Sequence, residues 1–122
     1  MESLNIAAVQ ETLSLINGKW KIPIIVILRI HGESRFKDLM ENISGIGTKM
    51  LSKELKELEQ QGIIHRKVFE TTPVSIKYEL SLYGKTLDKI LYAMNDWGEG
   101  HLQRKENYNP DHPIQHFNTI DI

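Results

Sequence analysis

The stretch FKDLMENISGIGTKMLSKELKELEQQ, residues 36–61, decides the fold. Apolar side chains at spacings of three and four indicate a short helix that ends at Ile43 and a longer helix over residues 48–61. The turn between them, Ser44-Gly45-Ile46-Gly47, is short and holds two glycines. Two helices joined by such a turn are typical of a helix-turn-helix motif.

The two sides of the longer helix differ in chemistry. Leu51, Leu55 and Leu58 repeat at spacings of four and three, which predicts a buried face. The opposite side of its first half carries Thr48, Lys49, Ser52, Lys53 and Lys56. Lysines near a helix start oppose the helix dipole, a small cost that makes sense if a polyanion docks there. Because recognition helices present their N-terminal residues to the major groove, the pattern predicts a recognition helix. A plain amphipathic helix with solvated lysines is the alternative.

Two strands and a further helix are predicted downstream. Residues 63–69 and 75–80 have strand character, and Glu70 to Val74 form a hairpin tip between them. A hairpin after a helix-turn-helix motif is the wing of a winged helix, expected here over residues 66–77. Ser81 is placed to cap a final helix. One face of that helix carries Leu87, Ile90, Leu91, Met94 and Trp97.

Two helices are predicted upstream. The seam Ile6, Val9, Leu13 and Ile16 marks the first, which ends at Asn17-Gly18. Residues 20–30 are apolar on all sides and are expected to be buried, with Trp20 in the core. Their length favours a helix with Pro23 in its first turn, although their β-branched side chains also suit a strand. Residues 31–34 are expected to form a turn. The predicted fold is mainly α with a small β-hairpin wing.

The length and composition fit one soluble domain. The chain has 122 residues, of which 40% are hydrophobic and 25% charged. We expect the domain over residues 1–106 and a loosely ordered tail, rich in Asn, Pro and His, over residues 107–122. No apolar run reaches the length of a membrane span, and the N-terminus does not resemble a signal peptide. A cytoplasmic location is therefore expected.

The net charge of −1 conceals an uneven distribution. Residues 19–89 hold 13 Lys and Arg against 9 Asp and Glu, whereas the rest of the chain holds 2 against 7. A basic middle between acidic ends favours a polyanion-binding centre, although a balance of this size is also ordinary for a stretch of this length.

The sequence favours no enzyme, cofactor or metal centre. It contains no cysteine, which excludes disulfides, thiolate metal sites and cysteine nucleophiles. No Ser/His/Asp arrangement, glycine-rich phosphate loop or paired-carboxylate cleft emerges. His101, His112 and His116 have a loose metal-ligand spacing, but two of them lie in the expected tail, and no metal site is predicted.

Six motifs occur in a specific order along residues 7–100. They are Gly18-Lys19-Trp20-Lys21, Arg35-Phe36-Lys37-Asp38-Leu39, the segment from Gly45 to Glu59, Gly62-Ile63-Ile64-His65-Arg66, Tyr78-Glu79-Leu80-Ser81 with Gly84, and Trp97-Gly98-Glu99. Together they resemble the HxlR family of bacterial transcription regulators, which is related to MarR-type winged-helix repressors. The resemblance implies homodimers that bind palindromic operators and dimerise through the N- and C-terminal helices.

The sequence departs from the family pattern at three places. Many members carry a cysteine just before the first helix, used in some for redox or electrophile sensing, but here residues 4–9 read LNIAAV, so thiol sensing is excluded in this chain. Gly47 stands where the family usually has serine. The family wing often ends in Pro-Pro and a basic residue, whereas this chain has Pro73-Val74-Ser75. The tip has lost its charge, while Lys67 and Lys77 add charge lower on the strands.

These observations assign two surfaces. The expected DNA-binding residues are Arg35, Thr48, Lys49, Ser52, Lys53, Lys56, His65, Arg66, Lys67, Thr71, Thr72, Ser75 and Lys77. The expected dimer interface is Ile6, Val9, Leu13, Ile16, Leu87, Ile90, Leu91, Met94 and Trp97. The expected partners are double-stranded DNA and a second copy of the chain, with room for a small-molecule effector that no residue identifies. The alternative is a winged-helix module that binds protein instead of DNA, which the acidic flanks and low net charge favour.

Overall fold

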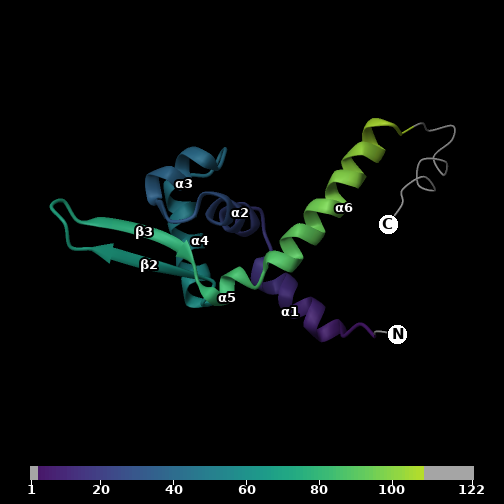
Figure 1. Ribbon diagram of the computed structural model, residues 1–122, viewed down its shortest axis with the longest axis horizontal. Helices are drawn as coiled ribbons and strands as arrows, with labels where there is room; N and C mark the ends of the chain where they lie inside the picture. Colours follow the sequence, from purple (N-terminus) through teal and green to yellow (C-terminus); the bar gives the residue numbers. More distant parts are fainter. Residues whose placement is uncertain (1–2, 109–122) are drawn as a thin grey trace. The chain divides into compact units, whose positions relative to one another are not determined.

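The computed structural model describes residues 3–108 and confirms a mainly helical winged-helix fold (Figure 1). The elements are α1 (Ile6–Ile16), α2 (Lys21–His31), β1 (Ser34–Arg35), α3 (Phe36–Asn42), α4 (Thr48–Gln60), β2 (Ile64–Phe69), β3 (Ser75–Leu80), α5 (Leu82–Lys85) and α6 (Asp88–Glu106). The chain forms two compact units, residues 1–86 and residues 87–122. The first unit contains the winged helix, and the described part of the second is essentially α6.

The leucine face of α4 lies at the centre of the first unit. Leu51, Leu55 and Leu58 are fully buried, as their spacing predicts. The other large, fully buried side chains are Ile24 and Ile25 of α2, Leu39 of α3, and Ile63 and Ile64 at the start of the wing. Burial of these apolar side chains supplies most of the free energy that holds the unit together.

The predicted helix over residues 20–30 is confirmed, but its burial on all sides is not. It forms α2, with Pro23 in the first turn, where the missing N–H has no helical partner to lose. Ile24, Ile25 and Leu28 are buried, whereas Ile30 is 68% exposed. Ile22, Val26 and Ile27 are half-buried, so in a unit this small the core covers only part of the surface of α2.

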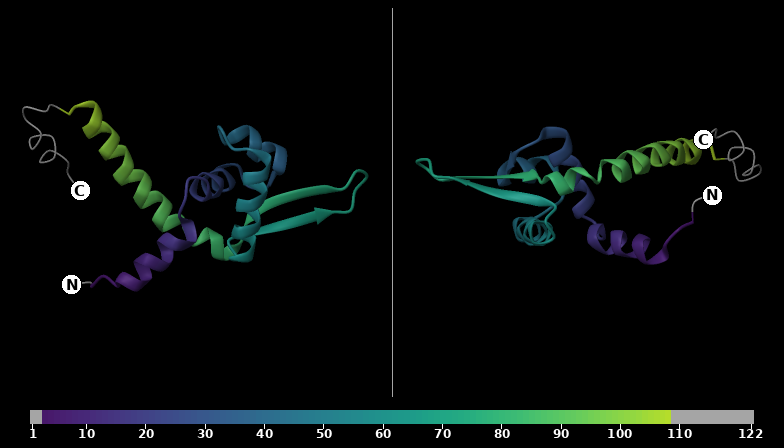
Figure 2. Two further views of the ribbon diagram at one scale, coloured as in Figure 1. Left: turned by 180° about the vertical axis from the view of Figure 1, so that it is seen from behind. Right: turned by 60° about the horizontal axis from the view of Figure 1, so that its bottom comes forward.

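The wing is a three-stranded antiparallel sheet in the order β1-β3-β2. The hairpin β2–β3 projects from the helices and has α4 beside its base (Figure 2). Strand β1 corrects the expectation that residues 31–34 form only a turn, because Ser34 pairs with Tyr78 and Arg35 with Lys77. A two-residue strand has no periodicity of its own, and only its pairing with β3 defines it.

The prediction of a single final helix that begins after Ser81 is wrong. Ser81 caps the four-residue helix α5, where its hydroxyl oxygen accepts a 2.8 Å hydrogen bond from the N–H of Gly84. Its hydroxyl also lies 2.6 Å from the carbonyl oxygen of Gly62. Helix α6 begins separately at Asp88. The Ser81 hydroxyl does cap a helix, as the sequence predicts, but that helix is the short α5 rather than the long final one.

No helix among residues 3–108 is long and apolar enough to cross a membrane.

Gly84, in α5, lies very close to the backbone of Ile63, the residue just before β2. A Cβ atom added there would collide with the carbonyl oxygen of Ile63, which is backbone and has little freedom to move. We therefore expect Gly84→Ala to lower the free energy of unfolding by about 3 kcal/mol. Gly47→Ser is the control, since nothing lies within 4 Å of the position of its Cβ atom. Urea denaturation of the two variants tests this; equal stability would show that the close approach relaxes without cost.

Candidate nucleic-acid interface

The N-terminal half of α4 forms an exposed polar face opposite its leucines. Thr48, Lys49, Ser52, Lys53 and Lys56 are all exposed. The first turn contains no acidic residue, and its N-cap, Gly47, makes no side-chain hydrogen bond to the helix. The backbone N–H groups of this turn therefore have no capping side chain, which suits a phosphate oxygen as their partner. Hydroxyl and ammonium groups at this end are donors for base edges as well.

A buried ion pair joins the start of α2 to the inner side of α4. The Nζ atom of Lys21 lies 2.8 Å from Oε2 of Glu54 and 2.6 Å from Oε2 of Glu57. The side chains of Lys21 and Glu54 are only 8% and 10% exposed. Burial lowers the pKa of Lys21, but its hydrogen bonds to the two carboxylates outweigh this and leave the pKa raised. The hydrogen bond from Lys21 lowers the pKa of Glu57. Both shifts favour the charged forms of Lys21 and Glu57.

Lys53 belongs to the same network. Its Nζ atom lies 3.4 Å from Oε1 of Glu57 and 3.8 Å from Oε1 of Glu54. The predicted base-contacting lysine is thus held on the side of the helix by the carboxylates that Lys21 also binds. Sequence reasoning missed this role of Lys21, because a lysine in an apolar stretch gives no local sign of its distant partner.

The wing lysines are also paired with carboxylates. Nζ of Lys67 lies 2.8 Å from Glu79 and 3.3 Å from Glu33, and Nζ of Lys77 lies 3.5 Å from Glu33. The hydrogen bonds to Glu79 and Glu33 raise the pKa of Lys67, and the bond from Lys67 lowers the pKa of Glu79. The cluster thus joins two basic and two acidic side chains, whose formal charges cancel.

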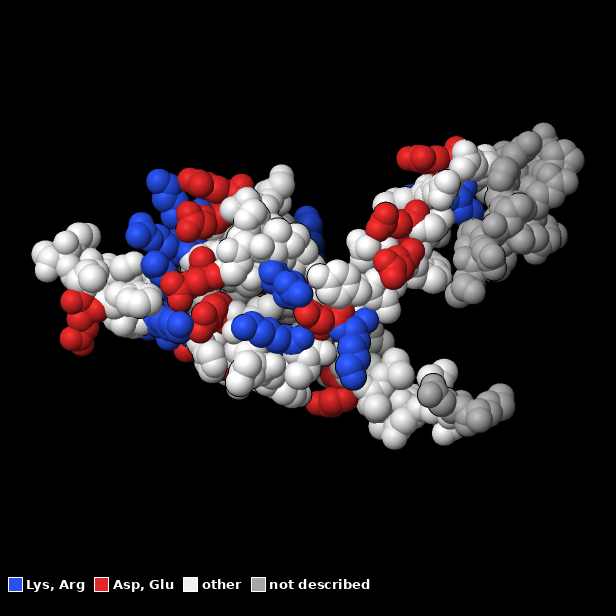
Figure 3. Space-filling view, in the orientation of Figure 1, with Lys and Arg blue, Asp and Glu red and all other residues white. Residues whose placement is uncertain are grey.

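The remaining Lys and Arg side chains of the predicted DNA-binding set differ from these lysines in their ion pairs. Within residues 3–108, no carboxylate ion pair involves Arg35, Lys49, Lys56 or Arg66. Acidic and basic side chains intermingle near the base of the wing (Figure 3). Among the described residues, the candidate interface therefore has four basic groups without a competing carboxylate, two on α4 and two on the sheet.

The tip of the wing carries no basic side chain. Thr71 and Thr72 are exposed there, and the hydroxyl of Thr71 donates to the carbonyl oxygen of Pro73 at 2.7 Å. In Figure 3 the tip shows a carboxylate but no Lys or Arg. His65 and Arg66 are exposed on β2, and Ser75 is half-buried on β3. Any phosphate contacts of the wing are thus confined to its strands and tip hydroxyls.

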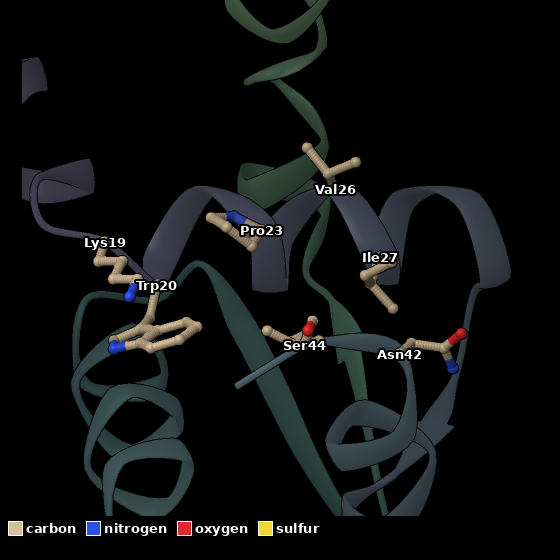
Figure 4. Close-up of a pocket in the computed structure, with 8 residues that line it drawn as sticks. Lys19, Trp20, Pro23, Val26, Ile27, Asn42 and Ser44 are labelled. Atoms are coloured by element: carbon tan, nitrogen blue, oxygen red, sulfur yellow. The ribbon is translucent and has the colours of Figure 1, made fainter. Parts of the chain in front are cut away.

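An open groove of about 390 Å³ lies between α2 and the turn that links α3 to α4. It is lined by Lys19, Trp20, Pro23, Val26, Ile27, Asn42, Ile43 and Ser44. Figure 4 shows Lys19 and Trp20 at one end and Asn42 at the other. The Nζ atom of Lys19 lies 4.7 Å from the centre of the Trp20 ring. Trp20, predicted to be core, is only half-buried and forms part of the groove wall.

The expected dimer residues are mostly accessible. Ile6, Val9 and Leu13 on α1 are exposed, whereas Ile16 is buried in its own unit. On the second unit, Met94 and Trp97 are exposed, and Leu87, Ile90 and Leu91 are partly exposed. Each helix thus carries an apolar stripe at the protein surface, which is unusual for a protein that functions as a monomer.

The histidines form no cluster in the described part of the chain. The ring of His101 stacks on that of Trp97, with centroids 5.0 Å apart. His112 and His116 lie outside the described residues, as does most of the tail expected over residues 107–122. Within residues 3–108 no three His, Cys, Asp or Glu side chains are grouped as metal ligands would be.

Removal of the Lys21 ammonium leaves two carboxylates facing each other at the edge of the core. We expect Lys21→Met to lower the free energy of unfolding by about 3–5 kcal/mol, because it strands a buried charge. The double variant Lys21→Met/Glu54→Met should recover much of this loss, since it removes the stranded charge as well. Urea denaturation at neutral pH measures both. A single variant as stable as the wild type would show that water solvates the two carboxylates.

Comparison with known proteins agrees with this architecture. The family pattern described as HxlR-like helix-turn-helix matches residues 15–106. The HTH-type transcriptional regulator YtcD of Bacillus subtilis is 41% identical over 97 residues, which are 80% of this chain and 76% of that protein. A crystal structure of ytcD matches with a TM-score of 0.75 and 39% identity over 82% of this chain and 99% of that chain. The redox regulator HypR in its reduced form matches with a TM-score of 0.76 and 37% identity over 83% and 99%. The chain therefore belongs to the HxlR-like helix-turn-helix family of transcriptional regulators.

Proposed function

We propose that the protein binds DNA as a homodimer and recognises a pseudo-palindromic operator. Helix α4 enters the major groove with its N-terminal half, and the wing lies along the sugar-phosphate backbone. The observation that carries this proposal is the two-sided chemistry of α4. Its leucine face is fully buried, while residues 48–53 expose hydroxyl and ammonium groups together with Met50 and contain no acid, and the first acid of the helix, Glu54, is buried. If the bound DNA is chromosomal, this function puts the protein in the cytoplasm of a bacterial cell.

The base-reading residues in this proposal are Thr48, Lys49, Ser52 and Lys53. Lysine donates to guanine O6 and N7, and the hydroxyls of threonine and serine contact several base edges or a thymine methyl group. Arg35, Arg66 and Lys56 serve as phosphate contacts, with His65, Lys67, Lys77 and the wing hydroxyls of Thr71, Thr72 and Ser75 as lesser ones. Phosphate contacts set the register on the duplex but carry no direct sequence information.

The second copy in this proposal covers the apolar stripes of α1 and α6. A symmetric dimer presents two recognition helices, so the half-sites of its operator are about one helical turn apart or a multiple of it. Covering the stripes removes Ile6, Val9, Leu13 and Trp97 from water, which supplies the free energy of association.

A charge placed in the α1 stripe should prevent dimerisation. Leu13 is 59% exposed in the single chain, and a dimer would bury it. We expect Leu13→Glu to be monomeric at micromolar concentration, because an unpaired carboxylate cannot enter an apolar interface without a large desolvation cost. Ala7→Glu, on another side of the same helix, is the matched control and should remain dimeric. Sedimentation velocity distinguishes the two; a monomeric wild type would contradict the dimer itself.

Substitutions of base-reading residues and of phosphate-contacting residues should have different effects on the ratio of operator to random-duplex affinity. Ser52→Ala or Lys53→Ala should weaken operator binding by about 1–3 kcal/mol and relax specificity at one position in each half-site. Arg66→Ala should weaken binding to operator and random duplex by the same factor, because a phosphate contact is independent of sequence. An operator obtained by selection from a random duplex library, and titrations at one fixed salt concentration, provide the measurement.

The result that would overturn this assignment is an unchanged ratio of operator to random affinity in both α4 variants while they remain folded. Absence of DNA binding by the wild type at low salt would instead favour the protein-interaction alternative.

A further inference from the structure

Glu33 occupies a position between the two lysines of the wing. It lies in the short loop before β1, and its carboxylate contacts Lys67 through Oε2 at 3.3 Å and Lys77 through Oε1 at 3.5 Å. The two lysines are direct partners in the β2–β3 register. Side chains of direct antiparallel partners lie on the same face of the sheet, where like charges repel. Glu33 therefore bridges two ammonium groups that would otherwise repel each other across the strand pair.

Glu79 completes the cluster from β3. Its Oε1 atom lies 2.8 Å from Nζ of Lys67. The four side chains are all partly exposed, between 30% and 44%. They are thus accessible to a ligand, but each ammonium group already has an anionic partner, a carboxylate, in the place that a phosphate would take. Lys67 has two carboxylate partners, Glu33 and Glu79, whereas Lys77 is paired with Glu33. Lys77 is therefore the less strongly paired of the two lysines.

We infer that Glu33 and Glu79 compete with DNA phosphate for Lys67 and Lys77 and so restrain sequence-independent binding by the wing. This inference rests on the proposed DNA-binding function and adds how strongly the wing takes part in it. A lysine that passes from a carboxylate to a phosphate gains little net attraction, and the carboxylate it leaves then repels the DNA. The wing therefore contributes less affinity than its lysines suggest, and a larger share falls to α4, which reads sequence.

The restraint should be measurable as a gain of affinity when the carboxylate is removed. Glu33→Gln keeps the size of the side chain and frees Lys77. Each added phosphate contact steepens the log–log dependence of affinity on salt by about 0.9, so one freed lysine in each protomer of a dimer gives a change of about 1.8. We expect the affinity for a random-sequence duplex of 24 base pairs to rise at least about threefold at 0.1 M salt. Operator affinity should rise by the same factor, which leaves their ratio unchanged.

Two controls separate this effect from a general change of charge or stability. Glu59→Gln makes the same charge change on the C-terminal half of α4, where Glu59 is exposed and has no ion pair among residues 3–108. It should change the random-duplex affinity much less than Glu33→Gln does. The double variant Glu33→Gln/Lys77→Met should lose the gain, because the lysine that makes the new contact is absent. Thermal unfolding verifies that all variants remain folded.

The outcomes distinguish the inference from the function on which it rests. If the wild type binds DNA but Glu33→Gln leaves both affinity and salt slope unchanged, or weakens binding, Glu33 does not restrain the wing and the inference is overturned. A gain in Glu59→Gln as large as that in Glu33→Gln also overturns it, since the effect would then be one of net charge. If neither the wild type nor any variant binds DNA, the proposed function itself fails.

Discussion

The orientation of helix α4 depends on the contact between Lys21 and the carboxylates of Glu54 and Glu57. The leucine face supplies most of the free energy that holds α4 in place, but apolar contacts have little directional preference. Hydrogen bonds to charged groups do have a direction, and those of Lys21 reach α4 from one fixed point at the start of α2. The helix is thereby restrained against rotation about its axis. The leucines thus set which side of α4 faces outward, and a lysine in a different helix restrains how far that side can turn.

Local signals in the sequence were sufficient to predict the main elements. The leucine spacing and Gly62 placed the recognition helix at 48–61, and the structure has it at Thr48–Gln60, with Gly62 at φ 78° in the left-handed region that glycine favours. The sequence predicts strands at 63–69 and 75–80, and the structure has them at Ile64–Phe69 and Ser75–Leu80. Each of these signals lies within a few residues of the element that it predicts.

Contacts between distant residues could not be predicted in this way. Lys21 and Glu54 are 33 residues apart, and Lys67 and Glu33 are 34 apart, so no spacing rule connects them. The charge count treated Lys53, Lys67 and Lys77 as equivalent to Lys49 and Arg66, although folding places carboxylates beside the first three. The break between α5 and α6 lies at Thr86 and Leu87, where the sequence has neither glycine nor proline, so no local signal marks it.

The sheet order has a consequence for how copies of the protein meet. Strand β3 lies between two neighbours, so within the described part of the chain the edge of the hairpin that stays unpaired along its full length belongs to β2. An open edge offers free N–H and C=O groups to another strand, and Val68 and Phe69 add exposed apolar surface beside it. Arg66 and Lys67 lie on the same strand. When two such edges approach in antiparallel register, these side chains bring like charges together, which disfavours strand-to-strand aggregation in a protein whose net charge is too small to keep copies apart.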